Sequence, residues 1–81
     1  MDINDIKPDG ILDVKGLTCP MPLLKTKKTL KGMNAGQVLE VLGTDPGSKN
    51  DIPEFCRKGG NELLAMADDD QGVTRYFIKK G

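Results

Sequence analysis

The chain has 81 residues, of which 12 are basic and 12 acidic, so its formal net charge is zero. This length gives one domain with one modest core, and the balanced charge argues against a protein that mainly holds nucleic acid by its phosphates. No apolar run approaches the roughly 18 residues of a membrane span. The N-terminus lacks the basic start and apolar core of a signal peptide, so we expect a cytoplasmic protein.

The first ten residues are polar and predict a flexible leader (residues 1–10) before a single domain over residues 11–81. Ile11 to Lys15 predicts a short strand, which a turn over Gly16 to Thr18 follows. Asp13 is either an ordinary polar residue at a strand end or a hydrogen-bond acceptor that fixes this turn. Because a carboxylate close to a thiol opposes thiolate formation, we prefer the positioning role.

A helix is predicted over Leu23 to Lys31, where strong helix formers are followed by Gly32 as a stop. Pro20 and Pro22 fall in its first turn and stiffen it, because the first N–H groups of a helix have no intrahelical acceptor to lose. Spacings of three and four predict a core-facing stripe on this helix. The stripe consists of Leu23, Thr26, Leu30 and Met33, with Leu24 beside them.

Cys19 precedes this helix and is the candidate reactive residue. A thiol at a helix N-terminus faces unpaired N–H groups and the positive end of the helix dipole, so we expect its anion to be favoured. With an ordinary pKa of about 8.5, roughly 3 % of a cysteine is ionised at pH 7, and about 1.4 kcal/mol of stabilisation raises this to about 25 %. The competing interpretation is a small buried hydrophobic residue, which the two adjoining prolines make less favoured.

The densest positive cluster in the chain lies on the same helix and consists of Lys25, Lys27, Lys28 and Lys31. It is either a solvated helix surface or a docking face that steers an acidic partner toward Cys19. An alternative function is a small nucleic-acid-binding or regulatory module that uses this lysine-rich helix, an analogy at the level of fold. Zero net charge and the lack of interleaved arginine or aromatic residues count against direct nucleic-acid binding.

The second half of the chain begins with a strand and a helix. Gln37 to Leu42 has strand composition. The helix lies between Ser48 and Lys58 and is closed by Gly59-Gly60 in a left-handed conformation. Its start is either a cap at Ser48 or, because Pro53 prefers an early helical position, a boundary at Asp51 or Ile52.

A hairpin ends the chain, with strands over Asn61 to Ala67 and Val73 to Lys79 around an acidic turn at Asp68 to Gly72. The acidic run lacks the ligand pattern of a calcium-binding EF-hand loop, so we interpret it as a solvated turn. In the last strand, alternation places Tyr76 and Ile78 on the inner face of the sheet. Phe77 belongs to the other set, with Arg75 and Lys79.

The predicted order β-α-β-α-β-β gives an α/β two-layer sandwich, with two helices on one face of a four-stranded mixed sheet. The far face of the sheet is then turned to solvent, where Arg75 and Lys79 can sit. The chain contains no histidine, so a metal site would need both thiolates and carboxylates, and we expect none.

Ten positions carry a motif, Asp13-x-x-Gly16-x-x-Cys19-Pro20-x-Pro22, which matches the CPxP signature of the TusA-type, SirA-like sulfur carriers. Asp45 to Cys56 resembles the second block of that family, so the resemblance covers nearly the whole chain. It implies the same fold and a protein that accepts sulfane sulfur on Cys19 as a persulfide, or as a thiosulfonate, and relays it to an acceptor protein. Asp13, Gly16, Pro20 and Pro22 would then shape the site.

The resemblance also implies partners: a sulfur donor, either a cysteine desulfurase or a rhodanese, and an acceptor relay protein of the TusBCD or DsrEFH kind. Transfer-RNA thiolation, molybdenum-cofactor maturation and dissimilatory sulfur oxidation are all compatible with such a carrier. Without a histidine as general base or room for a deep pocket, we expect a protein co-substrate rather than a stand-alone sulfurtransferase enzyme, monomeric and without a cofactor. A thiol peroxidase or oxidoreductase is disfavoured, since no resolving cysteine lies nearby.

Cys56 is the second cysteine, 37 positions after Cys19, and a structural disulfide between the two is not expected in the reducing cytosol. It shares a helix face with Ile52 and Phe55, which favours a packed core thiol. The alternative, an auxiliary sulfur acceptor or resolving thiol, requires Cys56 to be exposed on the same side as Cys19.

Overall fold

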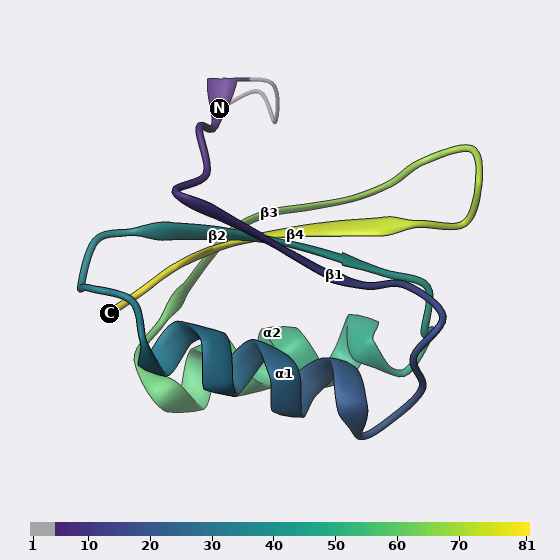
Figure 1. The fold of residues 1–81 in the computed structure, drawn as a ribbon, viewed down its shortest axis with the longest axis horizontal. Helices are drawn as coiled ribbons and strands as arrows, with labels where there is room; N and C mark the ends of the chain where they lie inside the picture. Colours follow the sequence, from purple (N-terminus) through teal and green to yellow (C-terminus); the bar gives the residue numbers. More distant parts are fainter. Residues whose placement is uncertain (1–4) are drawn as a thin grey trace.

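The computed structural model describes residues 5–81, which form two layers (Figure 1). One layer is a four-stranded sheet, and the other is a pair of helices packed against one face of it. In chain order, the elements are β1 Gly10–Val14, α1 Met21–Lys31, β2 Val38–Gly43, α2 Ser48–Gly59, β3 Glu62–Asp68 and β4 Thr74–Lys79. The predicted fold class is therefore confirmed. Neither helix of this described part reaches the length and hydropathy that a membrane crossing requires.

The sheet has the spatial order β1-β2-β4-β3. β1 and β2 run parallel, with Leu12 opposite Val41, whereas β4 is antiparallel to both of its neighbours. Because the ends of parallel strands point the same way, the loop from β1 to α1 and the loop from β2 to α2 leave the sheet at the same edge (Figure 1). Cys19 lies in the first of these loops.

The boundaries of α1 follow from proline at its start and glycine at its end. Pro22 falls in the first turn, where its missing N–H would have had no intrahelical acceptor. Gly32 ends the helix as predicted, and its N–H donates to the Thr29 carbonyl at 3.1 Å.

The buried stripe of α1 consists of Pro22, Thr26 and Leu30. Leu24, which we expected beside this stripe, is 48 % exposed. An α-helix turns by about 100° per residue, so Leu24 lies about 200° around the helix from both Pro22 and Thr26. The prediction for Leu24 was wrong because proline, not leucine, fills the first buried position.

Helix α2 begins at Ser48, three residues before the alternative boundary at Asp51. The loop before it satisfies the first free donors, since the N–H groups of Ser48 and Lys49 donate to the carbonyls of Asp45 and Pro46. The N-cap position is Gly47, so Ser48 does not cap the helix. The Ser48 hydroxyl instead donates a hydrogen bond to the Asp45 carboxylate at 3.2 Å.

The end of α2 is confirmed as a left-handed stop. Gly60 has a φ of 76°, and the Asn61 N–H donates to the Cys56 carbonyl at 3.0 Å. Pro53 lies inside the helix and removes one backbone N–H from it.

The core lies between the sheet and the two helices. Its fully buried members come from five of the six elements, and they are Val14, Leu30, Leu39, Val41, Ile52, Cys56, Tyr76 and Ile78. Burying one large aliphatic or aromatic side chain contributes about 1.5–3 kcal/mol. The predicted inner placement of the two β4 residues in this set is confirmed.

Phe77 lies on the opposite face of β4, and it is nevertheless 0 % exposed. The Arg75 guanidinium lies 5.2 Å from the centroid of the Phe77 ring, and its Nε donates to the Glu40 carboxylate at 2.9 Å. Glu40 is opposite Phe77 in the sheet register and is itself only 8 % exposed. The expectation of a solvent-facing far side is therefore wrong at Phe77, although Lys79 is exposed there.

The leader predicted over residues 1–10 lies in part outside the described residues. Within them, the Asp9 N–H donates to the Val38 carbonyl at 2.7 Å, and the Asp9 carboxylate accepts the Val38 N–H at 2.8 Å. Gly10 already belongs to β1. The end of this segment is thus bonded to β2 rather than free.

Candidate functional site

The loop between β1 and α1 presents Cys19 at the sheet edge. Its first turn is held locally, because the Asp13 carboxylate accepts a hydrogen bond from the Lys15 N–H at 2.9 Å. The Leu17 N–H then donates to the Val14 carbonyl at 3.2 Å. Asp13 therefore lies at the entry to the loop, where the positioning role suggested by the sequence requires it.

Gly16 links the loop between β1 and α1 to the loop between β2 and α2. Its φ of 81° is in the left-handed region that favours glycine. Its N–H donates to the Thr44 hydroxyl at 2.9 Å, and Thr44 directly follows β2. Sequence reasoning missed Thr44. The signal that could have found it is its place after a strand parallel to β1, since the carboxyl ends of parallel strands share one edge.

Cys19 itself is exposed, and its sulfur has fewer free amides around it than we expected. The Met21 N–H, the first of the helix, already donates to the Thr18 carbonyl at 2.9 Å. Pro20 and Pro22 have no N–H to offer. The prolines that shape the helix start therefore also reduce its capacity to stabilise an anion.

Asp51, in the first turn of α2, is the residue that the fold brings to Cys19. The Cys19 Sγ donates a hydrogen bond to the Asp51 Oδ2 at 3.7 Å. The pKa of Cys19 is raised above its ordinary value, first by partial desolvation, then by the charge of Asp51 and the hydrogen bond to it, and finally by the charge of Asp45. The expectation of a favoured thiolate is therefore wrong for the free protein, in which the neutral thiol is favoured.

Cys56 is 2 % exposed and packs in the core from α2. Burial raises the pKa of its thiol to about 11. The interpretation as a packed core thiol is confirmed, and the exposure that a resolving thiol requires is not met. The two cysteines are both free.

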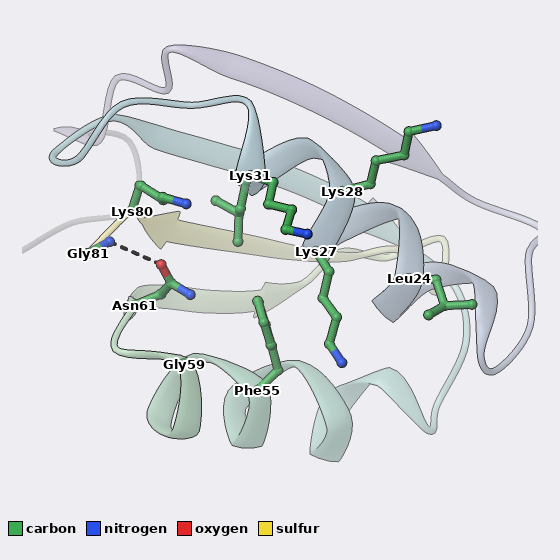
Figure 2. Close-up of a pocket in the computed structure, with 10 residues that line it drawn as sticks. Leu24, Lys27, Lys28, Lys31, Phe55, Gly59, Asn61, Lys80 and Gly81 are labelled. Carbon is green, nitrogen blue, oxygen red and sulfur yellow. Dashed lines mark hydrogen bonds between the residues drawn. The ribbon is translucent and has the colours of Figure 1, made fainter.

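The four lysines of the predicted docking face do not all line the same surface hollow. Lys27, Lys28 and Lys31 line a hollow of about 510 Å³ between α1 and α2, whereas Lys25 is not part of its wall (Figure 2). The Lys27 Nζ lies 5.5 Å from the centroid of the Phe55 ring across this hollow. The structure thus separates Lys25 from the lysines that face α2.

No three metal-ligating side chains gather anywhere in residues 5–81. The chain has no histidine that could act as a general base beside Cys19. Fold and site together define a small two-layer α/β protein with one exposed cysteine mounted between a strand and a helix.

The comparisons with known proteins agree with this description. A family model described as sulfurtransferase TusA matches residues 10–80. The chain is 47 % identical over 72 residues to the sulfur carrier protein TusA of Allochromatium vinosum, which covers 89 % of this chain and 93 % of that protein. It is 41 % identical over 78 residues to the sulfur carrier protein TusA of Pseudomonas putida, with 96 % of each chain covered.

A solved structure gives the same result for the fold. The crystal structure of a SirA-like protein from Desulfitobacterium hafniense matches with a TM-score of 0.78 and 27 % identity, over 89 % of this chain and 97 % of that one. The chain belongs to the TusA family. Membership supports a TusA-like sulfur-carrier function and confirms the resemblance drawn from the CPxP motif.

Proposed function

We propose that the protein is a sulfur carrier in which Cys19 accepts sulfane sulfur as a persulfide and passes it to an acceptor protein. The observation that supports this most directly is the exposed Cys19 thiol, held at the family motif between β1 and α1. Cys56, the other thiol, is buried in the core. Cys19 is therefore the residue that a partner protein can reach.

The transfer needs no oxidant or reductant. The Cys19 thiolate attacks the outer sulfur of a donor persulfide, a new S–S bond forms at Cys19, and the donor cysteine leaves as a thiolate. In the second transfer, an acceptor thiolate attacks the outer sulfur on Cys19, and Cys19 leaves as a thiolate. Since the thiolate is the attacking form, the proton of the Cys19 thiol must first go to solvent or to a partner group.

The donor we propose is a cysteine desulfurase or a rhodanese, and the acceptor is a sulfur-relay protein of the TusBCD or DsrEFH kind. The relay serves transfer-RNA thiolation, molybdenum-cofactor maturation or dissimilatory sulfur oxidation. The names of the relatives, sulfur carrier protein TusA, support the relay role. Neighbouring genes distinguish these three pathways, because each has its own donor and acceptor proteins.

The test is sulfur loading by a cysteine desulfurase with cysteine, followed by intact-mass and peptide mass spectrometry. We expect the wild-type protein to gain one sulfur atom on the peptide that contains Cys19. Cys19→Ser should lose this gain completely, because an alcohol does not accept sulfane sulfur.

Cys56→Ala is the matched control, since it removes the other thiol and should retain the gain. A sulfur gain that disappears with Cys56→Ala and persists with Cys19→Ser would contradict the proposal. If the added mass is that of a thiosulfonate group rather than of one sulfur atom, the carried group is not a persulfide, but Cys19 remains the carrier residue.

A further inference from the structure

A surface groove runs between α1 and α2. Two neighbouring hollows of about 510 and 420 Å³ share Lys27, Phe55 and Gly59 in their walls, and we call the two together the interhelix groove. Figure 2 shows the larger of them. The smaller hollow includes Asp51, which accepts the hydrogen bond of Cys19. The interhelix groove therefore begins beside Cys19 and extends along α1 toward its C-terminal end.

The charge of the interhelix groove changes along its length. Its far half is lined by four lysines and by no acidic residue, and these lysines are Lys27, Lys28, Lys31 and Lys80. Among residues 5–81, none of the four forms an ion pair with a carboxylate. Its Cys19 half contains two carboxylates, Asp51 and Glu54, together with Lys27 and Lys58, so its lysines and carboxylates balance. Glu54 is ion-paired with Lys58 at 2.8 Å.

The floor of the interhelix groove is apolar. Phe55 lies in the walls of both hollows, and Leu24, which is 48 % exposed, borders the larger one. Figure 2 shows Phe55 rising from α2 toward the lysines of α1. An apolar floor beneath a positive rim is complementary to a segment that has both apolar and acidic side chains.

The length of the interhelix groove sets how long a bound segment must be to reach from Cys19 to the lysines. Lys31 is twelve positions after Cys19, which corresponds to about 18 Å along a helix. An extended chain covers that distance in about five to six residues. Lys27 lies about 12 Å from Cys19 along the helix, a distance that three to four residues of an extended chain cover.

We propose that the interhelix groove binds an extended acidic segment of the protein with which Cys19 exchanges sulfur. The partner's cysteine lies at the Asp51 end, an apolar side chain rests on Phe55, and carboxylates about five to seven residues from that cysteine meet Lys31 and Lys80. This inference rests on the proposed function, because it gives the sulfur partner its orientation.

A peptide fits the interhelix groove better than a nucleic-acid strand does. A nucleic acid has a negative charge at every phosphate and would be repelled by the Asp51 carboxylate, which contacts Cys19. A peptide can confine its carboxylates to the lysine end.

The test uses a fluorescein-labelled peptide with serine at the cysteine position, leucine about three residues from it and glutamates about five to seven residues from it. A second peptide has the same residues in reverse order, since the groove does not set the chain direction. Binding to the full protein is measured by fluorescence anisotropy. We expect one of the two peptides to bind, and Lys31→Glu to weaken it about tenfold, because one ion pair becomes a repulsion.

Lys25→Glu is the matched control, because it makes the same charge change on the same helix outside the interhelix groove. It should change the affinity less than about twofold in 0.15 M salt, where distant charges are screened. Equal weakening by both variants, no binding of either peptide, or tighter lysine-dependent binding of an oligo-uridine RNA would overturn the inference.

Loading of Cys19 from inorganic polysulfide, which has no segment to place in the groove, separates this inference from the proposed function. If wild-type Cys19 takes up sulfur while peptide binding fails, only the groove inference is lost. If Cys19 takes up no sulfur, the proposed function itself fails.

Discussion

The reactivity of Cys19 depends on two opposing features of its surroundings. The motif places the thiol beside the start of α1, where a helix dipole favours an anion. Partial desolvation raises the pKa of Cys19, and the Asp51 carboxylate, which lies against the same sulfur, raises it further. A cation brought next to Asp51 by a partner would weaken both effects of this carboxylate.

We predict that Asp51→Asn lowers the pKa of Cys19, because it removes the negative charge that favours the neutral thiol and supplies an amide N–H that can donate to the thiolate. The pH profile of Cys19 alkylation by iodoacetamide should shift to lower pH. Well below the pKa, each unit of decrease raises the thiolate fraction about tenfold. Because intrinsic nucleophilicity falls with pKa, the net gain in rate at fixed pH is about threefold per unit.

Glu54→Gln serves as the control for this measurement. It removes a carboxylate from the same helix, one that is ion-paired with Lys58 and does not contact Cys19. If both variants shift the profile equally, or if Asp51→Asn shifts it to higher pH, Asp51 does not act on Cys19 as described.

At the scale of the element, the loop between β1 and α1 depends on one backbone conformation. Gly16 adopts a φ of 81°, and a Cβ placed on it would contact nothing within 4 Å. Any cost of a side chain at this position is therefore conformational rather than steric. The same residue donates its N–H to Thr44, so the conformation also sets how the two loops meet.

We predict that Gly16→Ala destabilises the protein by about 1–2 kcal/mol, the cost of a left-handed conformation for a residue with a Cβ. Urea denaturation measures this free energy of unfolding. Gly32→Ala is the matched control, since Gly32 has a φ of −85° that alanine adopts without strain, and it should be neutral or slightly stabilising. Equal losses in the two variants would show that the backbone conformation of Gly16 is not the cause.

At the scale of the whole molecule, the single core links stability to pH through a buried thiol. Burial raises the pKa of Cys56 from 9.0 to about 11, so the folded protein binds more protons than the unfolded chain between these two values. The free energy of unfolding then falls as pH rises through this range. The contribution of the protonated Cys56 thiol to the free energy of unfolding is fully present below pH 9 and is lost above pH 11.

We predict that wild-type stability falls more steeply than that of Cys56→Ala between pH 9 and 11, by up to about 3 kcal/mol over the range. The slopes are compared rather than the absolute values, because alanine also removes packing contacts. Tyr76, whose pKa burial raises to about 12, is present in both proteins and contributes equally. Parallel stability curves would contradict the role of Cys56.

Much of the fold could be predicted because local pattern and layer architecture agree. Alternation in the last strand placed Tyr76 and Ile78 inside, and glycines marked both helix ends. Phe77 could not be placed, because alternation assigns a residue to a face of the sheet but does not reveal that Arg75 and Glu40 gather around it there.

The amino-acid sequence by itself determined the family, the two-layer order of elements and Cys19 as the candidate thiol, since each of these depends on residues close together in the chain. The tertiary structure decided what surrounds that thiol. Thr44 comes from the loop after β2 and Asp51 from the first turn of α2, 28 and 32 positions from their partners Gly16 and Cys19. They reach the site because β1 and β2 run parallel and end at one edge of the sheet, a pairing that no local pattern encodes.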